Sequence, residues 1–183
     1  MGAIWVFLPV LGGALAHAPV LTFDLLKPLK RPLDFGATWR GRRLFGDNKT
    51  WRGALVICLG VLATTVLLSG WDWWWAQLPA GLRDAGPWLY GLLLGLGVVL
   101  GELPNSFLKR RLGVAPGTRG RSLAGVLLSI YDQADFVLAV WLLLAPLWVM
   151  SVWQAAFVFV VVTAVHLVVN VIGYAIGARE TWI

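Results

Sequence analysis

A chain of 183 residues would ordinarily form one domain, but its composition is not that of a water-soluble protein. Hydrophobic residues make up 59% of the chain and charged residues 13%, against roughly 45–50% and about 25% in soluble domains. Its 12 tryptophans also exclude intrinsic disorder. Because 15 Lys and Arg residues outnumber 9 Asp and Glu residues, the net charge is +6. We therefore expect an integral membrane protein with cations concentrated in particular segments.

Apolar stretches predict five transmembrane helices, since a spanning helix needs about 20 mostly apolar residues. The predicted spans are residues 4–23, 53–69, 87–108, 131–150 and 152–176. Two longer polar loops, residues 24–52 and 109–130, join the first span to the second and the third to the fourth. Within the latter, residues 122–130 are either an interfacial or re-entrant piece or the first turns of the fourth span. The expected fold class is an all-α integral membrane protein with a single transmembrane domain, residues 1–183.

The distribution of cations predicts the orientation of these helices. Thirteen of the 15 Lys and Arg residues fall in loops 24–52 and 109–130. The positive-inside rule then places both loops in the cytoplasm, the N-terminus outside and the C-terminus inside. Tryptophans near the opposite ends of the spans agree with this orientation. The chemistry-bearing residues are in these two loops and the helix ends beside them, so we expect the active site on the cytoplasmic side.

Residues 34–53, which lead into the second span, are suited to binding phosphate. Glycines alternate with hydroxyl, amide and cationic side chains, among them Thr38, Asp47, Asn48, Lys49 and Arg52. Glycine permits close backbone approach, and a helix N-terminus offers free N–H groups to an anion. The alternative is a basic loop that only contacts anionic lipid. Such a loop would need neither the glycines nor the Asp–Asn pair.

Polar residues also enter the end of the third span. On a helix, Glu102, Ser106 and Lys109 share one face, and Asn105 lies near Lys109. Pro104 removes a backbone hydrogen bond there, which is typical of a broken helix that lines a cavity. The alternative is a Glu–Lys pair that only places charge at the membrane surface.

Asp132 and Asp135, at i and i+3, project from one helix face at the start of the fourth span. Each carboxylate costs about 2.5–3.5 kcal/mol at mid-bilayer on insertion scales, so such a pair indicates function. Two carboxylates near phosphate-binding cations suit Mg²⁺, which takes one or two carboxylates together with water and substrate phosphates. The alternative is that the pair neutralises nearby arginines.

Read in order, these motifs resemble those of the CDP-archaeol synthase family, and they are distantly similar to membrane CDP-diglyceride synthases. The matching motifs are residues 46–53 (Gly-Asp-Asn-Lys-Thr-Trp-Arg-Gly), residues 106–111 (Ser-Phe-Leu-Lys-Arg-Arg), the Pro116-Gly117 turn and residues 132–135 (Asp-Gln-Ala-Asp). The resemblance implies a CTP-dependent nucleotidyltransferase of phospholipid biosynthesis in the cell membrane. It would transfer the cytidylyl group of CTP, with Mg²⁺, to an isoprenoid ether-lipid phosphate (2,3-bis-O-geranylgeranylglycerol phosphate or similar) and release pyrophosphate.

The chemistry of that reaction fits the residue types present. A lipid phosphate is already an anionic nucleophile near pH 7, so the reaction needs charge neutralisation and positioning rather than a nucleophilic side chain. The expected catalytic residues are Lys49, Arg52, Lys109, Arg110, Asp132 and Asp135. The expected substrate-binding residues are Thr38, Asp47, Asn48, Asn105, Ser106, Pro116 and Gly117. The expected Mg²⁺ ligands are Asp132 and Asp135, with Glu102 as a third or supporting acid.

The expected partners are CTP, a lipid phosphate and membrane lipids, with no nucleic acid, and the oligomeric state stays open. Two alternatives remain at this point. A non-enzymatic anion carrier or lipid-binding membrane protein would need the basic loops but not the Asp pair. A phosphoalcohol transferase that consumes CDP-lipid would need a run of clustered Asp residues of the type Asp-Gly…Ala-Arg…Gly…Asp…Asp, which the sequence lacks.

Overall fold

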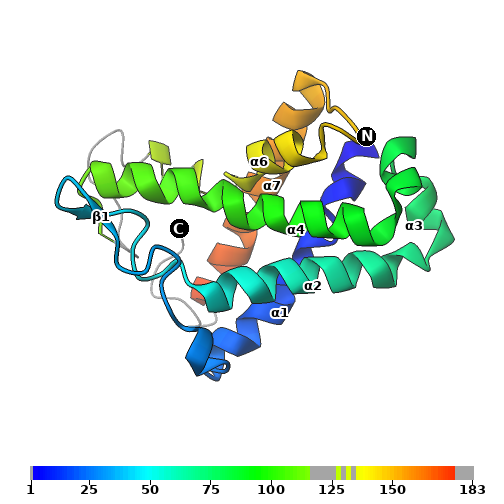
Figure 1. Ribbon diagram of the computed structural model, residues 1–183. Helices are drawn as coiled ribbons and strands as arrows, with labels where there is room; N and C mark the ends of the chain where they lie inside the picture. The colour runs from blue at the N-terminus through cyan, green and yellow to red at the C-terminus, as the bar shows by residue number, and fades with distance from the viewer. Residues whose placement is uncertain (1, 116–126, 129–130, 133–134, 176–183) are drawn as a thin grey trace.

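The computed structural model describes residues 2–115, 127–128, 131–132 and 135–175, and the chain there is almost entirely helical (Figure 1). Two short strands form a small antiparallel hairpin in which Thr38 pairs with Arg43. In chain order, the elements are η1 Gly2–Phe7, α1 Val10–Thr22, η2 Lys27–Leu29, β1 Thr38–Trp39, β2 Arg42–Arg43, α2 Trp51–Ser69, α3 Asp72–Ala76, α4 Ala80–Arg111, α6 Phe136–Leu144 and α7 Val152–Ala175.

Helix α4 is the centre of the bundle, packed against α2 and α6, while α1 packs against α2 (Figure 1). Glycines on α4 permit the close approach of these helices. A Cβ atom added to Gly95 would lie 2.8 Å from the carbonyl oxygen of Cys58 in α2, and one added to Gly101 would lie 2.4 Å from the Cα of Phe136 in α6. The position of α6 therefore depends on the absence of a side chain at Gly101.

The lengths of the helices bear on the predicted spans. By length and apolar composition, the helical stretches Gly2–Thr22, Trp51–Ser69 and Ala80–Arg111 could each cross a membrane, and α7 carries a shorter apolar stretch, Val152–Val165. Nine residues make α6 about 13 Å long, less than half of a bilayer core. The fourth predicted span, residues 131–150, thus holds a short helix followed by turns at residues 145–147.

The third predicted span, residues 87–108, is the part of α4 that follows a bend at Gly86, whose φ of 78° is not helical; α4 itself begins at Ala80. Pro104, by contrast, lies within α4 without breaking it. The φ of proline fits a helix, and its cost is one lost hydrogen bond and crowding of the preceding turn. The turns on either side of Pro104 hold the helix together, so the prediction of a broken helix at Pro104 was wrong.

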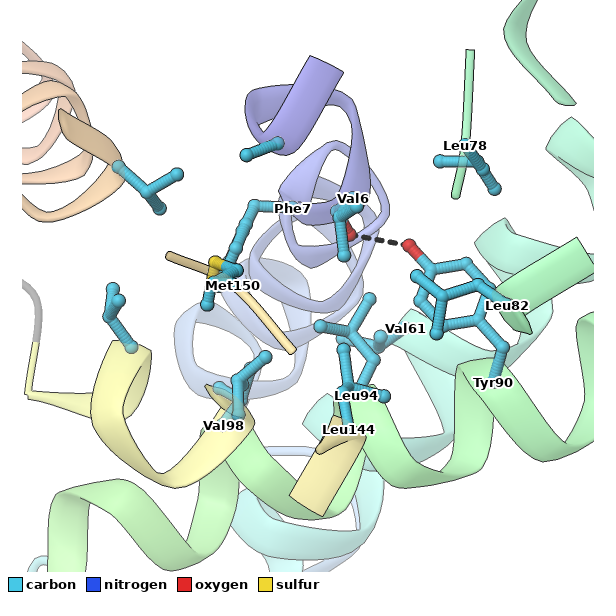
Figure 2. Packing of buried hydrophobic residues seen from close by; sticks show 14 of the residues in the cluster. Val6, Phe7, Val61, Leu78, Leu82, Tyr90, Leu94, Val98, Leu144 and Met150 are labelled. Atoms are coloured by element: carbon cyan, nitrogen blue, oxygen red, sulfur yellow. Dashed lines mark hydrogen bonds between the residues drawn. The ribbon is translucent and has the colours of Figure 1, made fainter. Parts of the chain in front are cut away.

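The apolar core occupies the part of the bundle nearer the N-terminus and α3. Val6, Tyr90, Leu94 and Leu144 pack together there, and the Tyr90 hydroxyl donates to the carbonyl oxygen of Val6 (Figure 2). The hairpin, the start of α2 and the end of α4 lie together at the opposite end of the bundle (Figure 1). The two basic segments therefore meet at one end, away from the core.

Candidate active site

A single buried carboxylate organises the loop before α2. The Asp34 side chain is fully buried and accepts hydrogen bonds from the backbone N–H groups of Gly36, Phe45 and Gly46 at 3.0–3.2 Å, and from Arg43 at 2.5 Å. Burial alone raises the pKa of Asp34, but these donors outweigh it and hold the pKa well below 3.8. Asp34 is therefore ionised and holds the loop in one conformation.

The β-hairpin is attached to the end of α4. Arg111 donates hydrogen bonds to the carbonyl oxygens of Trp39, Arg42 and Arg43. In return, Arg42 donates to carbonyl oxygens in the last turn of α4. The Trp39 ring stacks on Phe107 with centroids 5.5 Å apart. These contacts join the first basic loop to the end of the third predicted span.

A cavity of about 410 Å³ with both polar and apolar lining residues, which we call the Lys49 cavity, lies among α1, α2, α4 and the loop before α2. Five predicted site residues line it: Asp47, Asn48, Lys49, Arg52 and Glu102. These residues belong to two separate motifs in the sequence, and the structure brings them together. Three further polar residues, His17 of α1, Lys30 and Thr50, also line the cavity and were not predicted.

Lys49 lies beside Glu102, the third predicted acidic ligand. Its ammonium group forms an ion pair with Glu102. Burial lowers the pKa of Lys49, but Glu102, Asp135 and Asp132 raise it more, so the pKa lies above 10.5. Lys49 is therefore protonated and lies in the field of all three carboxylates.

Arg52 is held at the start of α2 by contacts with the end of the first span. It donates to Asp24 at 2.6 Å and to the carbonyl oxygen of Leu25 at 3.0 Å. The hydrogen bonds from Arg52 and Lys30 lower the pKa of Asp24 to about 2. Arg52 thus links α2 to the chain that follows α1, at the edge of the cavity.

The two predicted metal ligands meet at one amide group. Nδ2 of Asn105 donates to Asp132 at 2.8 Å and to Asp135 at 3.1 Å. Lys109 forms an ion pair with Asp132 at 2.7 Å. Asn105 is fully buried and Asp135 is 2% exposed, whereas the Asp132 side chain is 44% exposed. An amide of α4 therefore joins two aspartates that precede α6.

These groups fit a divalent cation bound by the two aspartates. The Oδ1 atom of Asn105 is buried beside them, with no hydrogen-bond partner within the described chain. Asp132 and Asp135 supply the carboxylate oxygens that Mg²⁺ prefers, and Mg²⁺ fills its other positions with water and phosphate. No group of three or more His, Cys, Asp or Glu residues with metal-site spacing occurs among the described residues. Glu102 is instead paired with Lys49.

The remaining predicted residues are placed differently. Thr38 is exposed on β1 and does not line the Lys49 cavity. Ser106 is buried within α4. Arg110 lines a second cavity of about 360 Å³ between the hairpin and the end of α4, together with Arg42, Arg43 and Asp47. Pro116 and Gly117 lie outside the described residues.

Several residues that build the site were missed at the sequence level. Asp34 acts through the conformation of its own loop, with partners up to 12 positions away, and Asp24 acts through an ion pair with Arg52, 28 positions away. The paired arginines 42–43 and 110–111 are a signal that could have been used, since each pair forms contacts with the other. Of these four arginines, only Arg110 was among the predicted site residues.

Comparison with known proteins decides the family. Residues 2–183 match the family described as CarS-like: CDP-archaeol synthase. The chain belongs to the CDP-archaeol synthase family. It is 34% identical over 166 residues to the CDP-archaeol synthase of Methanosarcina acetivorans, covering 83% of this chain and 90% of that protein. It is 35% identical over 193 residues to that of Halobacterium salinarum strain R1, covering 98% and 95%.

A solved structure supports the same assignment. It is that of an intramembrane enzyme for archaeal membrane lipids biosynthesis, with a TM-score of 0.66, 25% identity and 92% of each chain covered. Membership of the CDP-archaeol synthase family confirms the predictions of a CTP-dependent nucleotidyltransferase and of a multi-pass protein of the cell membrane. The alternatives of a non-enzymatic carrier and of a CDP-lipid-consuming enzyme are thereby removed.

Proposed function

We propose that this protein transfers the cytidylyl group of CTP to an isoprenoid ether-lipid phosphate, such as 2,3-bis-O-geranylgeranylglycerol phosphate, and releases pyrophosphate. Relatives named CDP-archaeol synthase support the reaction. The observation that carries the proposal is the pairing of Asp132 and Asp135 through Asn105, beside Lys109. This cluster places two carboxylates and the ammonium group of Lys109 side by side, within the electrostatic reach of Lys49 in the Lys49 cavity.

The reaction is a displacement at phosphorus. An oxygen of the lipid phosphate attacks the α-phosphorus of CTP and forms a new P–O bond. The bond between the α-phosphorus and the α,β-bridging oxygen breaks, and pyrophosphate leaves with that electron pair. Because both reactants are anionic, catalysis depends on neutralising and aligning phosphates.

We assign roles to the residues of the two clusters accordingly. Asp132 and Asp135 would hold Mg²⁺, which neutralises phosphate charge and aligns the two substrates when bound. Lys49 and Arg52 bind phosphate oxygens in the Lys49 cavity, and Glu102 supports the site by holding the Lys49 ammonium group. Lys109 and Arg110 bind phosphates at the end of α4. Asp47, Asn48, Asn105 and Ser106 shape the substrate pocket.

We also propose five crossings, with residues 131–150, including α6, as the fourth and both basic loops in the cytoplasm. Support comes from the gathering of the hairpin, the start of α2 and the end of α4 at one end of the bundle (Figure 1), and from the positive-inside rule. A small tag at the N-terminus should be inaccessible from the cytoplasm. Cytoplasmic labelling of that tag in sealed cells would contradict the orientation.

The reaction is tested with purified protein, CTP, Mg²⁺ and a panel of lipid phosphates carrying either isoprenoid ether or acyl ester tails. Pyrophosphate and CDP-lipid are measured together. We expect both products in equal amounts with the isoprenoid phosphates. Turnover with acyl phosphates only would contradict the proposed lipid, and turnover with neither class would contradict the reaction.

A further inference from the structure

The chain that joins α1 to α2 is held close to the ends of both helices. Each of these helices belongs to a stretch long and apolar enough to cross a membrane, and η2 lies against α2 (Figure 1). The backbone N–H of Trp51, the first residue of α2, donates to the carbonyl oxygen of Arg31 at 2.9 Å, and Arg52 donates to that of Leu25 at 3.0 Å. Residues 23–35, which we call the interfacial segment, therefore lie where α1 and α2 meet the membrane surface.

Large apolar side chains of the interfacial segment are exposed. They are Phe23, Leu25, Leu26, Leu29 and Phe35. Phe35 is 72% exposed, and its ring lies against that of Trp51, with centroids 6.0 Å apart. Exposed apolar clusters mark sites of contact with membranes or other molecules, and a tryptophan at the end of a spanning helix is typical of the membrane interface. The exposed side chains are therefore suited to contact with lipid.

Two of these exposed side chains belong to residues with an unfavourable backbone conformation. Leu26 has φ 55° and ψ 40°, and Phe35 has φ 48°. In this left-handed region the Cβ atom crowds the following carbonyl oxygen, so bulky residues are uncommon there. Such strain persists where surrounding contacts impose it, and it concentrates in functional segments. Because neither side chain is buried within the protein, the strain points to a contact outside the chain.

Cations accompany the apolar side chains. Lys27 and Arg31 are exposed, and neither lines the Lys49 cavity. The Lys27 side chain is 73% exposed and lies 3.9 Å from Asp24, a carboxylate that Arg52 binds more closely, at 2.6 Å. Basic residues beside Phe, Leu and Trp side chains are the pattern of segments that lie in the plane of a membrane interface. Such cations attract anionic lipids.

We propose that the interfacial segment lies in the membrane interface, with its apolar side chains among the acyl chains and with Lys27 and Arg31 bound to the phosphate groups of anionic lipids. These lipids belong to the surrounding bilayer and are distinct from the lipid-phosphate substrate. With the orientation proposed above, they are lipids of the cytoplasmic leaflet.

This contact also bears on the depth of the candidate active site. Asp24 and the carbonyl oxygen of Leu25 hold Arg52, which lines the Lys49 cavity. A segment fixed at the membrane surface therefore keeps Arg52 near the depth of lipid phosphate groups, where a lipid-phosphate substrate lies. Only this consequence rests on the proposed function. The membrane contact itself is tested without substrate, so it can fail while the reaction stands, or stand while the reaction fails.

The depth of the segment is tested with a fluorescent label on the full-length protein in lipid nanodiscs. Cys58, the single cysteine, is buried and is replaced by alanine, and the label is attached in Leu26→Cys or Phe35→Cys. Lipids with brominated acyl chains should quench both labels strongly. Arg40→Cys is the matched control, because Arg40 lies in the turn of the hairpin, which extends beyond the start of α2 (Figure 1).

The control label should instead be quenched by iodide in the water and only weakly by the brominated lipids. Quenching by brominated lipids that is no stronger in Leu26→Cys and Phe35→Cys than in Arg40→Cys would overturn the proposal. It would equally be overturned if iodide quenched all three labels alike, because the segment would then face water.

The preference for anionic lipid is tested in nanodiscs that contain phosphatidylcholine and phosphatidylglycerol in equal amounts, with only one of the two brominated. Brominated phosphatidylglycerol should quench the Leu26→Cys label at least about twofold more than brominated phosphatidylcholine, since basic residues at a membrane surface concentrate anionic lipid. Lys27→Gln combined with Arg31→Gln should remove this difference. Lys27→Arg combined with Arg31→Lys keeps both charges and should preserve it. Equal quenching by the two lipids before these substitutions, or a difference that survives Lys27→Gln with Arg31→Gln, would overturn the role of the two cations.

Discussion

Asn105 donates a hydrogen bond of 3.1 Å to Asp135, 30 positions further along the chain. The bond joins the buried face of α4 to the residue just before α6, and the same amide also holds Asp132. The geometry of the acid pair therefore depends on how closely α6 packs on α4. Three of the predictions below change either this pair or that packing.

Asp135→Asn should abolish CDP-lipid formation while leaving the protein in the membrane. The substitution preserves size but removes a negative charge that Mg²⁺ would need, so turnover should fall by about a hundredfold or more. The measurement is CDP-lipid formed per minute at saturating CTP. Asp72→Asn is the matched control, because Asp72 is exposed on α3 at the other end of the bundle. Near-normal turnover in Asp135→Asn would remove the metal role.

Asn105→Ala should raise the Mg²⁺ concentration needed for half-maximal activity. Without the amide, neither aspartate is held in place, and loss of a group that orients metal ligands typically costs 10–100-fold in affinity. A titration of activity against Mg²⁺ at fixed CTP measures the shift. A fall in maximal rate with no change in the Mg²⁺ requirement would show that Asn105 does not act through the metal ligands.

Gly101→Ala should destabilise the protein and reduce activity together. The new methyl group would lie 2.4 Å from the Cα of Phe136, so α6 and the preceding Asp135 must shift. Overpacking of this kind costs about 1–3 kcal/mol. Gly70→Ala is the control, since its nearest contact is 3.5 Å. Melting temperature in detergent and CDP-lipid formation should both fall in Gly101→Ala only. An unchanged melting temperature would contradict the close packing of α4 on α6.

The residues that form the site could be predicted more fully than their arrangement. Lys49 and Glu102 belong to two motifs that the sequence shows 53 positions apart, and their chemistry indicated phosphate and metal binding. Their pairing depends on α2 and α4 packing side by side, which periodicity alone does not specify. Thr38 illustrates the opposite case: its hydroxyl suited phosphate, yet it lies exposed on the hairpin.

In the fold, too, long apolar helices can be predicted from the sequence, whereas features that depend on contacts between distant segments cannot. The second predicted span, residues 53–69, agrees closely with α2, because hydrophobicity and the Thr50 cap mark its ends. The third predicted span, residues 87–108, is the part of α4 that follows the bend at Gly86, while the turns of α4 from Ala80 to the bend were not predicted. The hairpin was missed because two-residue strands leave no periodic pattern, and it is held by Arg111 of a distant helix.

Asp34→Asn should lower the stability of the protein at neutral pH. The pKa of Asp34 lies below its ordinary value of 3.8 in the folded state. Its stabilising contribution is therefore complete above pH 3.8 and is lost as the pH falls further, towards the lower folded-state pKa. At pH 7 the variant leaves backbone N–H groups poorly paired, at a cost of about 1–3 kcal/mol.

The measurement is melting temperature between pH 7 and pH 2.5 in detergent. Wild type should lose stability below about pH 4, and Asp34→Asn should start lower and show a smaller fall over that range. Asp84→Asn serves as the control, as Asp84 is exposed on α4. Parallel pH profiles for wild type and Asp34→Asn would contradict the role of the ionised carboxylate.

The most direct test of the account is pyrophosphate release by the purified protein given CTP and Mg²⁺, with and without an isoprenoid ether-lipid phosphate. We predict release that requires the lipid phosphate, matches the CDP-lipid formed, and disappears in Asp135→Asn. Release that is independent of the lipid phosphate, or that persists in Asp135→Asn, would contradict it.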